Sequence, residues 1–202
     1  MNRWISLLCF ASAIAVAACS SEPSTSEQRA VAQPASITET DQTPAQAVQK
    51  FLVWYSQYQD SLNTMPTVPA SLDEDTTNIY AIDFQVVEQY LNLLRSSGQI
   101  SPQYLQQTKQ YFEQCQDSLK LHRQVDGPPE GLNFDRILYT QDAEYQTNLV
   151  LRSQPTVETG SDTAQVIYRW QEKDLSEGPD LVFSLIKQHN GWLILEIRPL
   201  FD

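Results

Sequence analysis

Residues 182–197 read VFSLIKQHNGWLILEI, and this stretch decides the fold class of the second half of the chain. Its two apolar runs flank Asn190-Gly191, a pair typical of two-residue hairpin turns in which both turn residues take a positive φ. We therefore expect strands at residues 182–187 and 192–197, paired as an antiparallel hairpin.

The segments before this hairpin are of two kinds. Residues 149–152 and 166–171 alternate their side chains in the manner of strands, so we expect an antiparallel sheet of about four strands. Residues 44–62, 83–97 and 101–122 instead repeat apolar side chains every three or four positions, as one face of a helix does. The residues expected to begin or end these helices are Thr43, Pro44, Asp83, Gly98, Ser101 and Pro102. Helices that precede an antiparallel sheet predict an α+β fold, with N-terminal helices packed on one face of a curved sheet.

The amino end carries the pattern of an exported lipoprotein. Residues 1–18 hold one basic residue, then an apolar run, then small residues, as secretory signal peptides do. The run is shorter than the roughly 20 apolar residues that span a bilayer. The tetrapeptide Val16-Ala17-Ala18-Cys19 resembles the lipobox of bacterial lipoproteins, which are cleaved before the cysteine and acylated there. We predict a lipoprotein signal peptide over residues 1–18 and lipid attachment at Cys19. An ordinary signal peptide with a chance cysteine is the alternative.

The residues after the cysteine bear on location. Ser20 stands where an aspartate commonly retains Gram-negative lipoproteins in the inner membrane, so an outer-membrane anchor facing the periplasm is favoured. Residues 20–43 are polar and hold no aromatic side chain, so they cannot bury enough apolar surface to offset chain entropy. We therefore expect residues 19–43 to be the lipidated cysteine and a disordered tether that spans roughly 25–30 Å on average.

Composition limits the partners of the chain. It has 13 Lys and Arg against 25 Asp and Glu, a net charge of −12, and loss of residues 1–18 would remove only Arg3 and leave −13. Such acidity argues against nucleic acid, whose phosphates require cationic side chains, and against direct binding to anionic lipid. If Cys9 is cleaved off and Cys19 is lipidated, only Cys115 remains. A single domain over residues 44–202 must then be stabilised by its core rather than by disulfides.

Three short motifs point to a known family. They are FLVWY at residues 51–55, DRILYTQD at residues 135–142 and NGWLI at residues 190–194. Together they resemble an uncharacterised family of bacterial lipoproteins and periplasmic proteins with an NTF2-like, cystatin-type α+β cone. The resemblance covers about residues 45–198 and implies a pocket between helices and sheet, but it implies no catalytic residues.

Aromatic and polar side chains are candidates to line such a pocket. They are Trp54, Tyr55, Asp83, Tyr90, Tyr139, Gln141, Asp142 and Trp170. A carboxylate in an apolar pocket could have a raised pKa and act as a base, with Asp83, Asp135 and Asp142 as candidates. The structural alternative is favoured for all three: Asp83 as a helix cap, and the other two as turn residues that bond their own backbone.

The favoured function is a non-enzymatic binding or accessory module of a membrane-anchored envelope lipoprotein, with an envelope protein or a small molecule as its ligand. We expect no cofactor, no metal and no nucleic acid, and membrane contact through the lipid alone. A pocket enzyme of the isomerase or dehydratase type is one alternative and requires a roomy pocket with an acid or a histidine inside it. An immunity or inhibitor protein with an acidic binding face is another.

Overall fold

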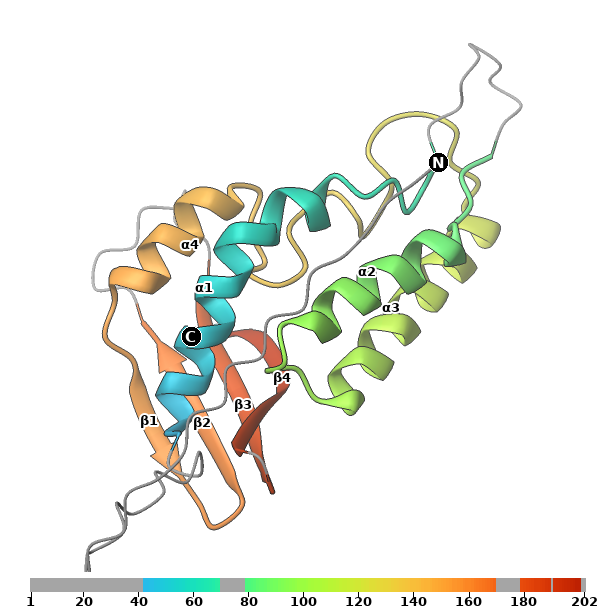
Figure 1. Ribbon diagram of the computed structural model, residues 1–202. Helices are drawn as coiled ribbons and strands as arrows, with labels where there is room; N and C mark the ends of the chain where they lie inside the picture. Colours follow the sequence, from blue (N-terminus) through green and yellow to red (C-terminus); the bar gives the residue numbers. More distant parts are fainter. Residues whose placement is uncertain (1–41, 70–78, 170–178, 190, 201–202) are drawn as a thin grey trace, which may run out of the picture. The chain divides into compact units, whose positions relative to one another are not determined.

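The computed structural model describes residues 42–69, 79–169, 179–189 and 191–200 (Figure 1). Within these residues the chain forms four helices followed by one four-stranded antiparallel sheet, which confirms the expected α+β class. The elements are α1 (Pro44–Asn63), α2 (Phe84–Ser96), α3 (Pro102–Leu121), α4 (Ala143–Arg152), β1 (Thr156–Thr159), β2 (Thr163–Tyr168), β3 (Asp180–Gln188) and β4 (Gly191–Leu200). The predicted signal peptide, Cys19, most of the predicted tether and Trp170 lie outside the described residues. None of the described helices is long and apolar enough to cross a bilayer.

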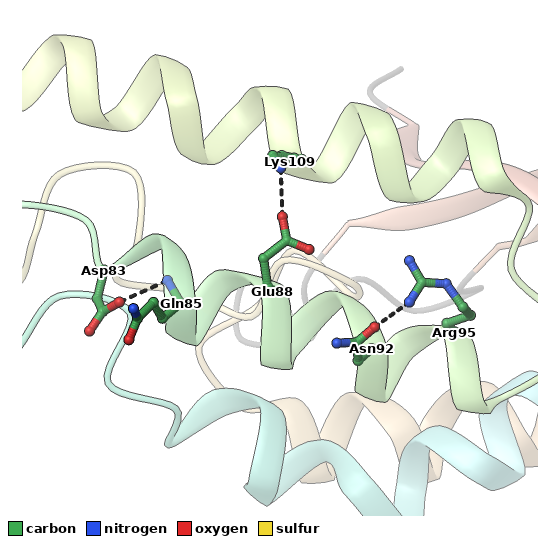
Figure 2. A network of polar contacts seen from close by, with 6 residues as sticks. All are labelled: Asp83, Gln85, Glu88, Asn92, Arg95 and Lys109. Carbon is green, nitrogen blue, oxygen red and sulfur yellow. Dashed lines mark hydrogen bonds and ion pairs between the residues drawn. The ribbon is translucent and has the colours of Figure 1, made fainter.

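The first three helices begin at the capping residues expected from the sequence. Thr43 forms a capping box: its Oγ1 accepts from the Gln46 backbone N–H at 3.3 Å, and Gln46 Oε1 accepts from the Thr43 N–H at 2.8 Å. At the start of α2, Asp83 Oδ1 accepts a hydrogen bond from the Gln85 N–H at 2.8 Å (Figure 2). Ser101 caps α3 in the same way. Each cap satisfies a backbone donor that the first helical turn leaves open.

Helices α2 and α3 lie side by side and are joined by a short turn at Gly98, whose φ of +67° suits glycine. Between the helices, Tyr90 packs edge-on against Phe112 with ring centroids 5.6 Å apart. At the surface, Lys109 Nζ lies 2.5 Å from Glu88 Oε1 (Figure 2). Because these two side chains are 44% and 48% exposed, the buried contacts stabilise the helix pair more than this ion pair does.

The turn between α2 and α3 also extends the sheet. The Ser101 N–H donates to the Ile194 carbonyl at 2.9 Å, and the Ile194 N–H donates to the Gln99 carbonyl at 2.8 Å. Ile100 thereby forms a parallel bridge to Ile194 on β4, the edge strand in the order β1-β2-β3-β4. The bridge pairs part of an otherwise open sheet edge and holds the start of α3 beside β4.

The segment 149–152, expected to be a strand, is instead the end of helix α4, whose N-cap is Asp142. The buried residues of this helix are Gln146, Thr147 and Val150. Two of the three are polar, so no apolar helical period is visible in the sequence. The first strand comes later, at Thr156–Thr159, where every residue is exposed and no alternation marks it. The predicted number of strands is right, but the first one was misplaced.

The terminal hairpin has the expected strands, but its turn lies one residue earlier than predicted. Gln188 pairs with Gly191, so the two-residue connection begins at His189 and Gly191 already belongs to β4. The φ of Gly191 is +122°, a conformation open to glycine and strained for other residues. Asn190 itself lies outside the described residues. The glycine is therefore required at the first paired position of the strand rather than inside the turn.

The hydrophobic core lies between α1 and one face of the sheet. Helix α1 buries Phe51, Leu52 and Tyr55 completely. The strands contribute a second set of buried side chains: Val166, Tyr168, Leu181, Phe183, Leu185 and Ile194. A register shift between β3 and β4 at Ser184/Leu185 marks a bulge, which curves the sheet around this core. Each fully buried apolar side chain of this kind contributes roughly 1.5–3 kcal/mol.

Buried tyrosines predict that the fold loses stability in alkali. Burial raises the pKa of Tyr168 to about 12 and the pKa of Tyr104 well above its usual value. Tyrosine in the unfolded chain ionises near pH 10, so above that pH the unfolded state loses protons that the folded state keeps. The stabilisation is therefore complete below about pH 10. It is lost above that pH at ~1.4 kcal/mol per pH unit for each such tyrosine, until the folded pKa is reached.

Urea unfolding followed by circular dichroism measures this slope, and the ultraviolet absorbance of tyrosinate follows the ionisation. Tyr168→Phe should reduce the alkaline slope, because one of the buried hydroxyls is gone. A free energy of unfolding that stays constant well above pH 10 would contradict the prediction.

Candidate functional site

A cleft of about 310 Å³ lies between α3, β4 and the loop at residues 134–140, and we call it the α3–β4 cleft. Its lining residues are Tyr104, Gln107, Thr108, Gln110, Tyr111 and Gln114 of α3, Arg136 and Tyr139 of the loop, and Glu196, Ile197 and Arg198 of β4. The volume is at the small end of the range for ligand pockets. The lining combines aromatic rings, side-chain amides and two guanidinium groups, which are the groups that recognise small polar ligands.

A larger hollow of about 510 Å³ lies over the sheet and is lined by residues of all four strands. Small and aliphatic residues form most of its lining, and Glu158 is the one charged side chain among the described residues there. No cation or aromatic ring is part of that described lining. The α3–β4 cleft is therefore the better candidate for a ligand site.

The loop beside the cleft is built around the carboxylate of Asp135, which is 6% exposed. Asp135 Oδ1 accepts from the backbone N–H groups of Ile137 at 3.0 Å and Leu138 at 2.6 Å. Asp135 Oδ2 accepts from the hydroxyl of Tyr55 on α1. The backbone N–H of Asp135 donates to the Thr140 carbonyl at 2.7 Å, which closes the loop on itself. A buried carboxylate is stable only when its oxygens are paired, and here three donors pair them.

Tyr139 leaves this loop in a strained conformation. Its φ of +56° is in the left-handed region, and no other non-glycine residue of the described chain has a positive φ. For an aromatic residue this conformation costs on the order of 1–3 kcal/mol and persists only where surrounding bonds enforce it. Two bonds do so: its backbone N–H donates to the Asp135 carbonyl at 2.8 Å, and its hydroxyl donates to the Ile197 carbonyl at 2.9 Å. The strain thus places an aromatic ring at the wall of the cleft.

Arg136 supplies a positive charge without a counter-ion. The guanidinium carbon lies 3.2 Å from the ring centroid of Tyr111, a cation–π contact, and Nε is buried without a hydrogen-bond acceptor. Among the described residues, no carboxylate forms an ion pair with it. Burial raises the pKa of Tyr111 and of Tyr139, and the positive charge of Arg136 opposes that rise in both. Arginine stays protonated at all physiological pH values, so the charge is permanent.

On the opposite wall, Arg198 is only weakly paired. Its Nε lies 4.0 Å from Glu196 Oε2, at the limit of an ion pair, and the two side chains are 41% and 50% exposed. An exposed pair at this distance contributes little binding energy. The guanidinium of Arg198 is therefore available to a ligand at little cost.

The aromatic residues predicted to line a pocket do not gather in one place. Tyr139 lines the α3–β4 cleft. Tyr55 and Tyr90 are buried in the core instead. Trp54 lies half-buried on α1, stacked on Tyr58 with ring centroids 5.1 Å apart. Trp170 lies outside the described residues.

The polar candidates have structural positions. Asp83 is the N-cap of α2. Asp142 is the N-cap of α4, where its Oδ1 accepts a hydrogen bond from the Tyr145 N–H at 3.0 Å. Gln141 is exposed before α4 and does not line the cleft. Asp135 bonds its own loop, so the structural interpretation is confirmed for Asp83 and Asp135, whereas Asp142 is the N-cap of a helix and not the turn residue that the sequence predicted. None of these carboxylates lines the cleft.

The histidines and Cys115 add no catalytic group to the cleft. His122 follows α3 and His189 lies in the hairpin connection, and both are exposed. Cys115 is buried, and burial raises the pKa of its thiol, which disfavours the reactive thiolate. Within the part of the chain that the structure describes, no three His, Cys, Asp or Glu side chains are placed to hold a metal ion.

Sequence reasoning missed the two kinds of residue that define the cleft. Gln107, Gln110 and Gln114 are spaced three and four positions apart on α3, and this polar stripe is readable from the sequence. Arg136 is not readable in this way, because its partner Tyr111 lies on a helix far upstream.

Comparisons with family models, curated proteins and solved structures found no match to this chain. The resemblance to NTF2-like lipoproteins therefore stays a prediction.

The bond between Tyr55 and Asp135 can be tested by removing one hydroxyl. Tyr55→Phe leaves a buried carboxylate oxygen without its donor, so the free energy of unfolding should fall by about 1–3 kcal/mol. Tyr58→Phe, one turn along the same helix and 38% exposed, is the matched control and should change it by less than about 0.5 kcal/mol. Equilibrium unfolding in urea measures both. Equal changes in the free energy of unfolding for the two substitutions would show that the buried hydrogen bond does not stabilise the fold.

Proposed function

We propose that this chain is a bacterial envelope lipoprotein, anchored through Cys19 to the outer membrane, whose domain is a non-enzymatic binding module. The observation that carries the binding role is the α3–β4 cleft, where Arg136 presents a positive charge that no carboxylate of the described residues pairs with. The lipobox Val16-Ala17-Ala18-Cys19 and the following Ser20 support the anchor and its location.

The candidate acidic side chains already form structural hydrogen bonds, and this favours a binding role over a catalytic one. Asp83 and Asp142 cap helices, and both oxygens of Asp135 already accept hydrogen bonds. A general base requires a free lone pair within reach of the substrate, and none of these carboxylates lines the cleft. Glu196 does line the cleft, but its side chain is 50% exposed, so it lacks the apolar surroundings that adapt a carboxylate to general-base catalysis.

One observation favours the enzyme alternative. The hydroxyl of Tyr55 and the carboxylate of Asp135 form a buried hydrogen-bonded pair of titratable groups, a combination found in active sites. Neither side chain lines a cavity among those in the described part of the chain. A substrate would have no access to the pair, and the pair is better explained as the support of the loop.

The anchor is tested by metabolic labelling with radioactive palmitate. Cys19→Ala should abolish labelling, because the thiol and the cleavage site are both lost. Cys9→Ala, within the predicted signal peptide, is the matched control and should be labelled like the unmodified chain. Continued labelling of Cys19→Ala would refute the lipid attachment site.

The binding role is tested by photo-crosslinking in intact cells. A photoreactive residue at Gln110, exposed at the cleft, should give a discrete adduct because the ligand lies within reach. The same residue at Gln85, exposed on α2 and outside the cleft lining, is the control and should give none. Mass spectrometry distinguishes a protein adduct from a small-molecule adduct. The absence of any adduct at Gln110, or equal adducts at both positions, would count against a binding site in the cleft.

A further inference from the structure

We propose that the α3–β4 cleft binds a small organic monocarboxylate, whose carboxylate pairs with Arg136 and Arg198 and whose apolar body lies against the tyrosines. This inference rests on the proposed binding function and deepens it by naming the chemical class of the ligand.

Among the described residues, Arg136 has neither a counter-ion for its guanidinium nor an acceptor for its Nε–H. A buried N–H without an acceptor and a charge without a counter-ion are both costly, and native proteins rarely leave them so. The adjacent Asp135 cannot serve, because its two oxygens accept from Tyr55 and from the loop backbone. A ligand oxyanion in the cleft supplies the missing counter-ion of the guanidinium. The guanidinium carbon lies 3.2 Å from the ring centroid of Tyr111, which holds the cation at the wall of the cleft, and a carboxylate is the acceptor whose two oxygens match a guanidinium best.

The net charge of the cleft lining distinguishes between classes of anionic ligand. The cleft holds Arg136, Arg198 and Glu196, a local net charge of +1 in a chain of net charge −12. One negative charge on the ligand neutralises the cleft. A second would face Glu196 and the acidic remainder of the protein. The balance therefore favours a monovalent carboxylate over a sulfate or a phosphate dianion.

The uncharged residues of the lining can contact the rest of the ligand. The rings of Tyr111 and Tyr139 offer apolar walls, and the amides of Gln107, Gln110 and Gln114 can hydrogen-bond polar substituents. A cavity of about 310 Å³ admits a small molecule. The strained φ of Tyr139 is consistent with a ring held in place for contact, since strain of this kind clusters at ligand sites.

The test uses the mature, lipidated protein in detergent, with benzoate, benzamide and sulfate as probes. Benzoate should bind saturably and shift the Nε–H signal of Arg136 in nitrogen–proton NMR spectra. Benzamide has the same shape without the charge and should bind about tenfold more weakly or worse, since one charge-assisted hydrogen bond accounts for a factor of that order. Sulfate should also bind more weakly than benzoate, because its second negative charge faces Glu196 and it has no apolar body to contact the tyrosines.

Variants locate the site. Arg136→Gln should weaken benzoate binding by about tenfold or more, and Arg198→Gln by about threefold, because its side chain is more exposed. Arg123→Gln removes the same charge from an exposed position outside the cleft and should leave the affinity unchanged. Circular dichroism checks that Arg136→Gln is folded. If it is not, Arg198→Gln decides the question without disturbing the contact with Tyr111.

The different negative results overturn different proposals. Benzamide or sulfate binding as tightly as benzoate, or full benzoate affinity in a folded Arg136→Gln protein, overturns the monocarboxylate assignment. An adduct at Gln110 in cells together with no benzoate binding overturns the ligand class and leaves the proposed binding function standing. No adduct and no benzoate binding overturn both.

Discussion

The candidate site depends on one buried interaction, the hydrogen bond from the Tyr55 hydroxyl to the Asp135 carboxylate. Burying a carboxylate costs several kilocalories per mole unless its oxygens are paired. Two N–H groups of its own loop and one hydroxyl from α1 pair them here. The same three bonds shape the loop and attach it to the core helix. The positions of Arg136 and Tyr139 follow from this attachment, because both residues belong to the loop.

Two further ties place the walls of the cleft, and both end on β4. The turn at residues 99–101 binds the backbone of Ile194 and holds the start of α3 beside the strand. The hydroxyl of Tyr139 binds the Ile197 carbonyl three residues further along the strand. A cleft between a helix and a sheet edge would otherwise close or widen as the elements shift. Here both walls are hydrogen-bonded to the same strand, β4. The strained backbone of Tyr139 is the local energetic cost of this attachment.

The sequence predicted what depends on neighbouring residues and missed what depends on distant ones. The starts of α1, α2 and α3 were predictable because a cap acts within three residues of itself. Helix α4 was missed because Gln146 and Thr147 are buried polar residues, which hide the helical period. The hairpin strands were predictable from apolar runs, but the turn was displaced because the positive φ of Gly191 is needed at a paired position. The role of Arg136 in the cleft was not predictable, because it depends on the Tyr111 ring of α3 and on Asp135, whose carboxylate is hydrogen-bonded to α1.

The contrast between the acidic chain and its cationic cleft bears on how a ligand would be recognised. The net charge of −12 repels anions at long range, but physiological salt screens such fields beyond about 8 Å. Contacts inside the cleft are partly desolvated and far less screened. A field of the wrong sign cannot steer an anion to the site, so association would gain nothing from electrostatic attraction at a distance. Selectivity for the proposed ligand must then arise after encounter, from the fit of one carboxylate to Arg136 and of an apolar body to the tyrosines. Differences in affinity between related ligands of such a site arise mostly from their dissociation rates, and the Tyr55–Asp135 bond, which attaches the loop to α1, fixes the wall on which those rates depend.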